Sequence, residues 1–321
     1  TPTTSAAFLL LFLITTMICL LCCQTAFSMG LGFGDDDDPP TVPTLEITPG
    51  PLASPVGISP IFSHKGLSSL LVTDAGKMSV NKIDPQDMGE VEELFTVEGL
   101  PLGIAEHNRR IYVGNRSTGS VDVYASNPAR SWLVNRIEAD MPMQPNDIAI
   151  DSKERRLFVA DGLANDVKVF TLFGRLVGTI DGFGALFDPR SVAIHSLSKS
   201  IAVTDSGDPK TGIPASVQVY DYSGVQLLHK TGEFSAPRGV ALSIDRLFVA
   251  DALLGQVLVF DRENGTLLGT FGSLGTDPQQ LLFPIDLVFD ETSELLYVVN
   301  NRMGNIVAYS SADFQAVEVT Q

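Results

Sequence analysis

The chain has 321 residues, of which 44% are apolar, and its formal net charge is −17. Such an acidic surface repels a phosphate backbone, so the composition argues against a nucleic-acid-binding protein. The three cysteines all lie within the first 23 residues, and the remainder of the chain therefore has no thiol for a disulfide or a cysteine-ligated metal.

Residues 1–28 contain no charged side chain, and residues 6–23 are predominantly apolar. As a helix, residues 6–23 would span about 27 Å, close to the thickness of a bilayer core. Three interpretations stay open: a secretory signal peptide cleaved near residues 26–28, a retained membrane anchor, and an anchor lipidated at Cys22 or Cys23. All three predict an extracytoplasmic protein, in the periplasm or at the cell surface, either secreted or tethered to a membrane through residues 6–23.

Residues 29–54 are rich in Gly, Pro and Asp, and include four consecutive aspartates at 35–38. Adjacent carboxylates on a flexible segment lack the preset geometry of a calcium site. We therefore interpret residues 29–54 as a solvated, self-repelling acidic linker.

From residue 55 onward one pattern returns six times: a proline, a short apolar strand that begins two residues later, and a second apolar strand that ends in Asp or Asn. The opening prolines are separated by 46, 44, 44, 48 and 47 residues, and they are Pro55, Pro101, Pro145, Pro189, Pro237 and Pro284. The second strands close in step with them, at Asp74, Asn115, Asp161, Asp205, Asp251 and Asn300. A strand-rich repeat of about 40 to 50 residues is typical of a propeller.

The second strands read as continuous apolar runs, as expected for a sheet covered on both faces. Several third strands alternate instead, such as residues 121–124, and we expect some of their side chains to meet water farther from the axis. With a fourth strand in most units, residues 55–321 predict an all-β fold, a six-bladed β-propeller of four-stranded antiparallel blades. Two segments could supply the outer strand of the last blade, residues 314–319 or residues 45–47.

One unit carries the pattern most fully, in residues 237–241 (PRGVA), 246–251 (RLFVAD) and 256–261 (QVLVFD). This unit resembles an NHL repeat, and the other five are looser versions of it. The resemblance covers residues 55–321, and its specificity lies in the sixfold register. Some proteins with NHL repeats bind RNA on a basic propeller face, which the acidic composition of this chain makes unfavourable.

In a propeller the first strand of each blade lines the central channel, and the loops that lead into these strands form one rim. Polar side chains follow the proline in blades 3 to 6 only, and we take them as the partner-binding candidates: Asn146, Asp147, Arg190, Arg238 and Asp286. The alternative is that these residues pair with one another and with channel water. The six Asp or Asn residues that end the second strands are expected to cap the following turns through backbone N–H groups.

Enzymes of similar architecture include amidating lyases, which bind zinc through histidines, and lactonases, which hold calcium in the channel. Here His64, His107 and His195 fall in separate turns opposite the entrance, and His229 lies in an outer strand, so a zinc site is not expected. Asn146, Asp147 and Asp286 could hold calcium.

No catalytic residue can be named from spacing. The sequence therefore favours an exported, non-catalytic interaction platform for a protein partner, such as an accessory subunit of an envelope complex, with no cofactor. The alternative is a calcium-dependent lactonase-like hydrolase or a peptidyl-hydroxyglycine lyase-like enzyme.

Overall fold

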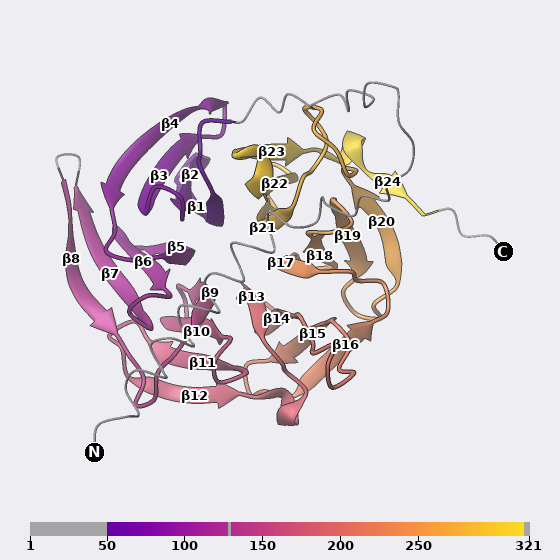
Figure 1. Cartoon of the computed structure of the whole chain (residues 1–321), viewed down its shortest axis with the longest axis horizontal. Coiled ribbons are helices and arrows are strands. Elements are labelled where there is room, and N and C mark those ends of the chain that lie inside the picture. Colours follow the sequence, from indigo (N-terminus) through magenta and orange to yellow (C-terminus); the bar gives the residue numbers. More distant parts are fainter. Residues whose placement is uncertain (1–49, 128–129, 318–321) are drawn as a thin grey trace, which may run out of the picture. The chain divides into compact units, whose positions relative to one another are not determined.

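The computed structural model describes residues 50–127 and 130–317, which form six antiparallel sheets around one axis (Figure 1). The innermost strands begin at the six predicted prolines, where a residue without an N–H fits the start of a ladder. In blades 1 to 6 they are β1 (Pro55–Ser63), β5 (Pro101–His107), β9 (Pro145–Asp151), β13 (Pro189–His195), β17 (Pro237–Leu242) and β21 (Pro284–Asp290). The predicted six-bladed propeller is confirmed.

The second strands end at the six predicted Asp or Asn residues. They are β2 (Gly66–Asp74), β6 (Arg110–Asn115), β10 (Arg156–Asp161), β14 (Ser200–Asp205), β18 (Arg246–Asp251) and β22 (Leu295–Asn300). Asp74 shows the common arrangement, because its Oδ1 accepts hydrogen bonds from the N–H groups of Gly76 (2.9 Å) and Lys77 (3.1 Å) in the following turn. The same side chain also accepts from Ser54 N (2.9 Å), so it fastens that turn to the loop that leads into the blade.

The third strands are β3 (Ser79–Asp84), β7 (Ser120–Asn127), β11 (Asp166–Thr171), β15 (Ser216–Asp221), β19 (Gln256–Asp261) and β23 (Asn305–Tyr309). The outer strands are β4 (Asp87–Thr96), β8 (Arg130–Ile137), β12 (Leu176–Ile180), β16 (Gln226–Thr231) and β20 (Leu267–Phe271). Three short 3₁₀ turns, η1 (Gly182–Gly184), η2 (Asn301–Met303) and η3 (Ser311–Asp313), lie in the connections. Within the described ranges, no helix is long and apolar enough to cross a membrane.

The last two blades depart from four strands. The C-terminal strand β24 (Gln315–Ala316) pairs with Thr270 and Gly269 of β20, and so adds a fifth strand to blade 5 (Figure 1). Blade 6 has three strands in the described part of the chain. The prediction that residues 314–319 complete blade 6 is therefore wrong, and the alternative segment, residues 45–47, lies outside the described residues.

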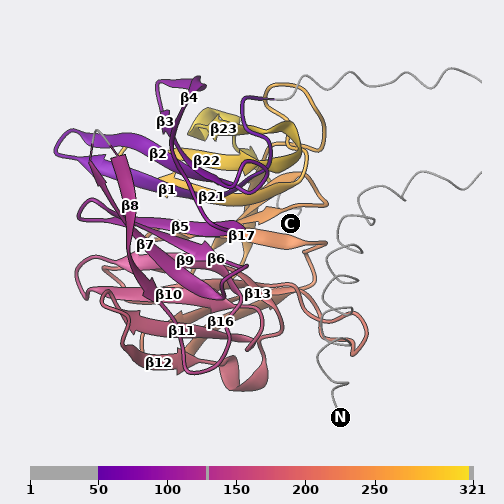
Figure 2. The same cartoon turned by 60° about the vertical axis from the view of Figure 1, so that its left-hand side comes forward.

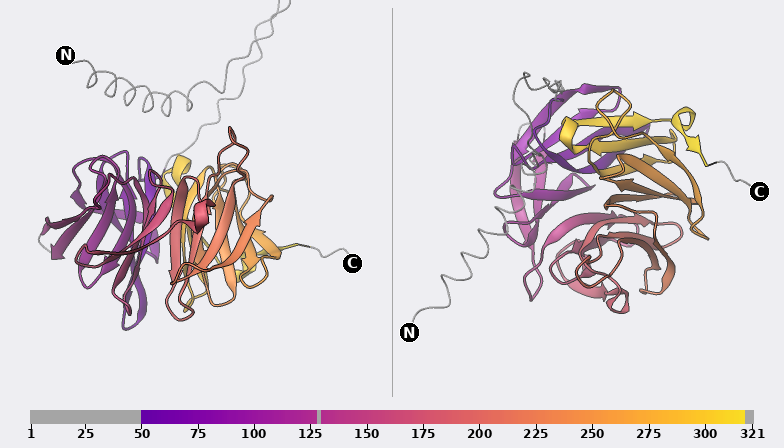
Figure 3. Two further views of the ribbon diagram at one scale, coloured as in Figure 1. Left: turned by 90° about the horizontal axis from the view of Figure 1, so that it is seen from below. Right: turned by 45° about the vertical axis from the view of Figure 1, so that its right-hand side comes forward.

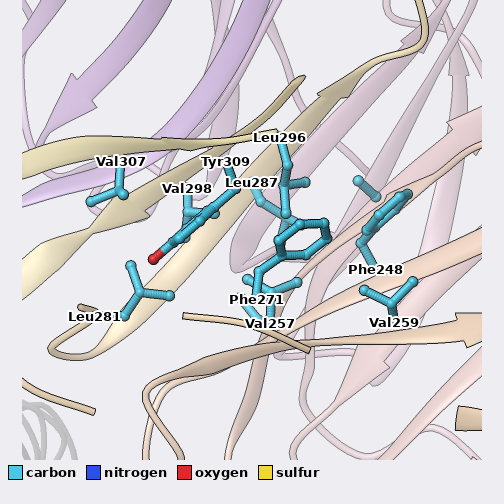
Figure 4. Packing of buried hydrophobic residues seen from close by; sticks show 12 residues of the cluster. Phe248, Val257, Val259, Phe271, Leu281, Leu287, Leu296, Val298, Val307 and Tyr309 are labelled. Atoms are coloured by element: carbon cyan, nitrogen blue, oxygen red, sulfur yellow. The ribbon is translucent and has the colours of Figure 1, made fainter. Parts of the chain in front are cut away.

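The core is divided among the spaces between neighbouring blades, and one buried cluster fills each of the six spaces. Figure 4 shows the cluster between blades 5 and 6, where Phe271 and Tyr309 pack with their ring centroids 5.7 Å apart. Because each blade buries both faces against its neighbours, its second strand reads as an apolar run. Leu52 joins the cluster between blades 6 and 1, so the propeller begins before Pro55.

The third strands differ from expectation. Their polar side chains Asp122, Lys168 and Gln218 are buried rather than in contact with water. Asp122 accepts a hydrogen bond from Arg136 Nε (2.7 Å), and Lys168 Nζ lies 2.8 Å from Asp166 Oδ1. In these strands, alternation of polar and apolar residues therefore indicates buried polar groups that have partners, rather than side chains in contact with water. A buried charge is tolerated when a partner group satisfies it.

We call the rim where the inner strands begin the entrance rim, and the rim where they end the exit rim. Figures 2 and 3 show the blades from the side, with strands that run between the two rims. The ring closes between blades 6 and 1 at the entrance rim, where Asn301 Nδ2 donates to Pro55 O (2.8 Å) and Leu52 N donates to Gly304 O (3.0 Å).

Candidate functional site

The second residue after each opening proline faces the channel axis, and together these six residues form what we call the axis layer. Its members are Gly57, Gly103, Asp147, Ser191, Gly239 and Asp286. A register shift occurs at this point in the ladder of every blade, so the strands bulge toward the axis. A Cβ on Gly103 would lie 2.5 Å from Asp147 Cα, and one on Gly239 would lie 2.6 Å from Asp286 Cα. Glycine next to each aspartate therefore permits this close approach.

Asp147 is buried in the axis layer and is surrounded by hydrogen-bond donors. Its Oδ1 accepts from Ile148 N (2.8 Å), and its Oδ2 accepts from Ser191 Oγ (2.6 Å) and Val192 N (3.0 Å) of the next blade. Three donors directed at one carboxyl group favour its ionised form. Asp147 therefore ties blade 3 to blade 4 at the axis.

Asp286 performs the equivalent task between blades 6 and 1. Its Oδ1 accepts from Leu287 N (2.9 Å), and its Oδ2 accepts from Ile58 N (2.9 Å). The chain positions of Ile58 and Asp286 are 228 residues apart, so this hydrogen bond helps to close the ring.

The two aspartates interact electrostatically. Burial raises the pKa of Asp147 to about 6, although its hydrogen-bond donors oppose the shift. Burial, and next the negative charge of Asp147, raise the pKa of Asp286 well above its usual value. Two like charges that share a dry site do not ionise together, so Asp286 is the group that retains its proton to higher pH.

The axis layer repeats with a twofold pattern across the ring. Blades 1 to 3 contribute Gly, Gly and Asp, and blades 4 to 6 contribute Ser, Gly and Asp. The connections repeat as well, because Thr73 Oγ1 donates to Leu102 O and Thr204 Oγ1 donates to Arg238 O, both at 2.5 Å. Blade 3 thus corresponds to blade 6, and blade 1 to blade 4.

A cavity of about 330 Å³ extends from the axis layer toward the exit rim, bounded by the inner strands of all six blades. Most of its lining residues are of apolar types, such as Ile104, Val192 and Leu287, and Asp147 and Asp286 add carboxyl groups from the axis layer. Glu106 adds a third carboxyl group to the lining.

The channel residues fit poorly with the calcium site considered from the sequence. Calcium takes six to eight oxygen ligands. The four carboxylate oxygens of Asp147 and Asp286 already accept protein donors, and the Asn146 side chain points between blades, where its Nδ2 donates to Pro189 O (2.8 Å). Among the residues that the structure describes, no three His, Cys, Asp or Glu side chains gather as a metal-ligand group.

Positive charge gathers on the entrance rim, around Asp188 and Phe283. Burial raises the pKa of Asp188, while the guanidinium groups of Arg190, Arg238 and Arg116 act to lower it. The Arg238 and Arg302 guanidinium groups lie 6.0 and 5.3 Å from the centroid of the Phe283 ring. We call Arg116, Arg190, Arg238 and Arg302 the entrance arginine cluster.

The entrance arginine cluster comes from four blades, and Arg116 and Arg302 are exposed. Sequence reasoning found Arg190 and Arg238 but missed Arg116 and Arg302, which follow the ends of second strands. The sequence did contain a signal for these two arginines, because each lies just after the Asp or Asn that ends a second strand. Arg116 directly follows Asn115, and Arg302 lies two residues after Asn300. Of the five predicted site residues, the structure thus places the two arginines on the rim, Asp147 and Asp286 in the axis layer, and Asn146 between blades.

The histidines lie apart from this site, as expected. His107 ends β5 and His195 ends β13, both at the exit rim. His195 is buried rather than solvated, with its Nε2 3.5 Å from Glu291 Oε1 and its Nδ1 2.6 Å from Ser198 Oγ. Burial lowers the pKa of His195, and these contacts give it a role in blade packing.

No protein-family model matches the sequence, and no curated protein matches it in sequence. Solved structures do match in fold. A Thermus thermophilus protein described as a putative oxidoreductase (glucose dehydrogenase) is similar with a TM-score of 0.59 and 15% identity, over 84% of this chain and 98% of that one. Virginiamycin B lyase from Staphylococcus aureus is similar with a TM-score of 0.56 and 12% identity, over 84% and 85% of the two chains.

A chain of the nidogen–laminin complex is similar with a TM-score of 0.55 and 13% identity, over 75% of this chain and 93% of that one. These neighbours include enzymes and a protein taken from a complex. At such low identity the likeness establishes the propeller fold and leaves the activity to be argued from the site.

Proposed function

We propose that this chain is an NHL-type propeller that acts as a non-catalytic interaction platform, and that its entrance rim contacts an acidic surface of a protein partner. The observation that carries the proposal is the entrance arginine cluster. It places four cations around Asp188, which pairs with Arg190, at one end of the axis in a chain whose formal net charge is −17. A partner that presents Asp or Glu side chains is attracted to this excess of positive charge and repelled by the acidic net charge of the rest of the chain.

The chemistry of the cluster suits a protein surface. Arginine forms paired hydrogen bonds to carboxylates and stacks on aromatic rings, and it is enriched at the residues that dominate binding energy. Phe283 adds an apolar centre between Arg238 and Arg302. The cluster therefore combines charge for orientation with apolar area for affinity.

The roles of the channel aspartates support binding over catalysis. Asp147 and Asp286 hold neighbouring inner strands together, because their carboxylate oxygens accept hydrogen bonds from backbone N–H groups of the next blade. The calcium-dependent hydrolase and the lyase considered from the sequence receive no favourable observation from this geometry.

The setting of the platform belongs to the same proposal. We infer that residues 1–28 direct export or anchor the chain, that the acidic segment between them and the propeller spaces the propeller from a membrane, and that the partner is part of an extracytoplasmic envelope complex. The absence of cysteine beyond residue 23 is compatible with that setting, because the folded domain depends on no disulfide.

Charge reversal at the entrance rim tests the proposal. The tagged full chain is used to capture partners from an envelope extract, and captured proteins are quantified for the wild type, Arg116→Glu and Arg302→Glu. Both sites are exposed, so the variants are expected to fold and to lose at least about tenfold of a specific partner, since like-charge contacts cost several kcal/mol.

Arg109→Glu is the matched control, because Arg109 is exposed on the exit rim and Glu294 shows that a glutamate fits the same left-handed backbone. Equal capture by all variants would reject the entrance rim as the contact surface. Stoichiometric calcium in the purified protein, lost on Asp147→Asn, would support the hydrolase instead.

A further inference from the structure

A second feature stands apart from the proposed contact surface. A surface pocket of about 270 Å³ lies on the exit rim between blades 2 and 3. Its lining comes from the β5–β6, β9–β10 and β11–β12 turns and the adjoining strands, and consists of His107, Asn108, Arg110, Tyr112, Arg155, Leu172 and Phe173. The pocket contains no carboxylate, which is unusual on so acidic a chain.

Two arginines give this pocket its charge. Arg110 and Arg155 are exposed, and among the described residues neither forms an ion pair. Their field reaches the floor of the pocket, where burial raises the pKa of Tyr112 while Arg110 and Arg155 act to lower it, and the charge of nearby Glu106 is the smallest of these influences and acts to raise it. An anion in the pocket would therefore meet two cations that carry no carboxylate partner.

The remaining lining is apolar or already engaged. Leu172 is buried, and Phe173 is 71% exposed, with the Arg155 guanidinium 5.6 Å from its ring centroid. His107 Nδ1 lies 3.0 Å from Ser152 Oγ, and its Nε2 lies 2.8 Å from Asn108 Nδ2.

We propose that this pocket binds a small organic anion, whose carboxylate or phosphate group lies between Arg110 and Arg155 and whose flat apolar group covers Phe173. The planar arginine fork matches either anion with paired hydrogen bonds. An exposed aromatic ring under a guanidinium group is a surface on which a second ring can stack. The volume lies at the low end for ligand sites, which limits the ligand to a molecule of about one ring and one acidic group.

Calorimetric titration of the full chain with benzoate, phenyl phosphate and benzyl alcohol tests the proposal. At about 0.15 M salt, interactions beyond about 8 Å are screened, so the measurement reports local charge. We expect one or both anions to bind with a Kd on the order of 1 mM, and neutral benzyl alcohol to bind at least about tenfold more weakly. The anion that binds more tightly identifies the acidic group.

Variants locate the site. Arg155→Asn preserves the left-handed backbone at φ 54, which asparagine tolerates, and Arg110→Gln removes the charge but keeps a polar side chain. Each is expected to weaken the anions at least about tenfold. Arg109→Asn is the matched control, since it removes the same charge from the same turn at φ 60 without lining the pocket, and it should leave Kd within about twofold.

Phe173→Ala separates the two halves of the proposed ligand. It should weaken phenyl phosphate and leave the binding of inorganic phosphate unchanged. Because Phe173 is mostly exposed, this variant folds even if an arginine variant does not. Failure of both organic anions to bind the wild type overturns the proposal, and so does an equal loss of binding in Arg109→Asn. Neither result bears on the entrance rim, which is tested with different residues.

Discussion

At the scale of single residues, the two channel aspartates, Asp147 and Asp286, each hold neighbouring blades together through hydrogen bonds. Sequence reasoning placed Asp147 and Asp286 on opposite sides of the axis, which the structure confirms through their place in blades 3 and 6. It could not tell that backbone N–H groups would occupy their oxygens, because the bulge that turns those groups inward has no sequence signature beyond the proline. The position of Arg302 could not be predicted from the sequence either. Arg302 and Arg238 both lie near the Phe283 ring, and this arrangement depends on the register between blades.

The coupling of these aspartates predicts a pH dependence. A carboxyl group whose folded pKa exceeds the unfolded value contributes stability that is complete below about pH 3.8 and is lost as the pH rises to about 6 for Asp147. For Asp147 alone this amounts to about 3 kcal/mol, at about 1.4 kcal/mol per pKa unit. Denaturant unfolding from pH 4 to pH 7 should show the decline in the wild type and a smaller decline in Asp147→Asn.

The carboxyl resonance of Asp286 provides the direct measurement. Loss of the Asp147 charge should move the pKa of Asp286 toward lower pH, since that charge is the second cause of its elevation. Asp245→Asn, at an exposed site, should change neither the decline nor the resonance. An unchanged pKa for Asp286 in Asp147→Asn would show that the two groups do not interact.

At the scale of the strand, the closing Asp or Asn residues predicted where the second strand of each blade ends. The inner strands begin at the prolines themselves, two residues earlier than the sequence pattern predicted. Both landmarks have a local physical cause. Proline removes a ladder donor, and a short polar side chain satisfies the turn that follows. The third strands were less predictable. Alternation in Val167-Lys168-Val169 is typical of a half-exposed strand, and only the neighbouring acids show that Lys168 is buried in an ion pair.

The close packing of the inner strands leads to a prediction about the stability of a glycine variant. Gly103→Ala places a Cβ 2.5 Å from Asp147 Cα, which requires the backbone of blade 2 or blade 3 to move. We expect this variant to lose on the order of 1–3 kcal/mol in denaturant unfolding, as overpacked cores do. Gly178→Ala is the matched control within a strand, because its nearest neighbour would be Val169 Cβ at 3.9 Å, and it should be neutral or slightly stabilising.

At the scale of the whole propeller, sixfold closure follows from the sequence period, but the division of strands between the last two blades does not. The C-terminal strand β24 could pair with either neighbouring edge, and it joins blade 5, where Phe314 packs on Phe271 with ring centroids 5.3 Å apart. Val317 N also donates to Leu268 O (3.0 Å), and the repeat pattern specifies neither contact.

Blade 6 supplies the corresponding prediction. The alternative that residues 45–47 supply its outer strand lies outside the described residues and stays a prediction, while Gly50 N at the start of the described range donates to Met303 O. Deletion of residues 1–49 should then lower Tm by several degrees and remove hydrogen-exchange protection in β23. Deletion of residues 1–28 alone should leave both unchanged. Equal protection of β23 in the two truncated chains would leave the strand assignment without support.

The correspondence of blade 3 with blade 6 at the axis has a consequence for ancestry. Two three-blade halves, each ending in one aspartate and each carrying one threonine bridge, are what duplication of a shorter gene would leave behind. The side chains that still match would then be those that neither half could lose without opening the ring. The entrance arginines, which have no counterpart at the equivalent positions of the other half, would be later acquisitions under selection for contact rather than closure.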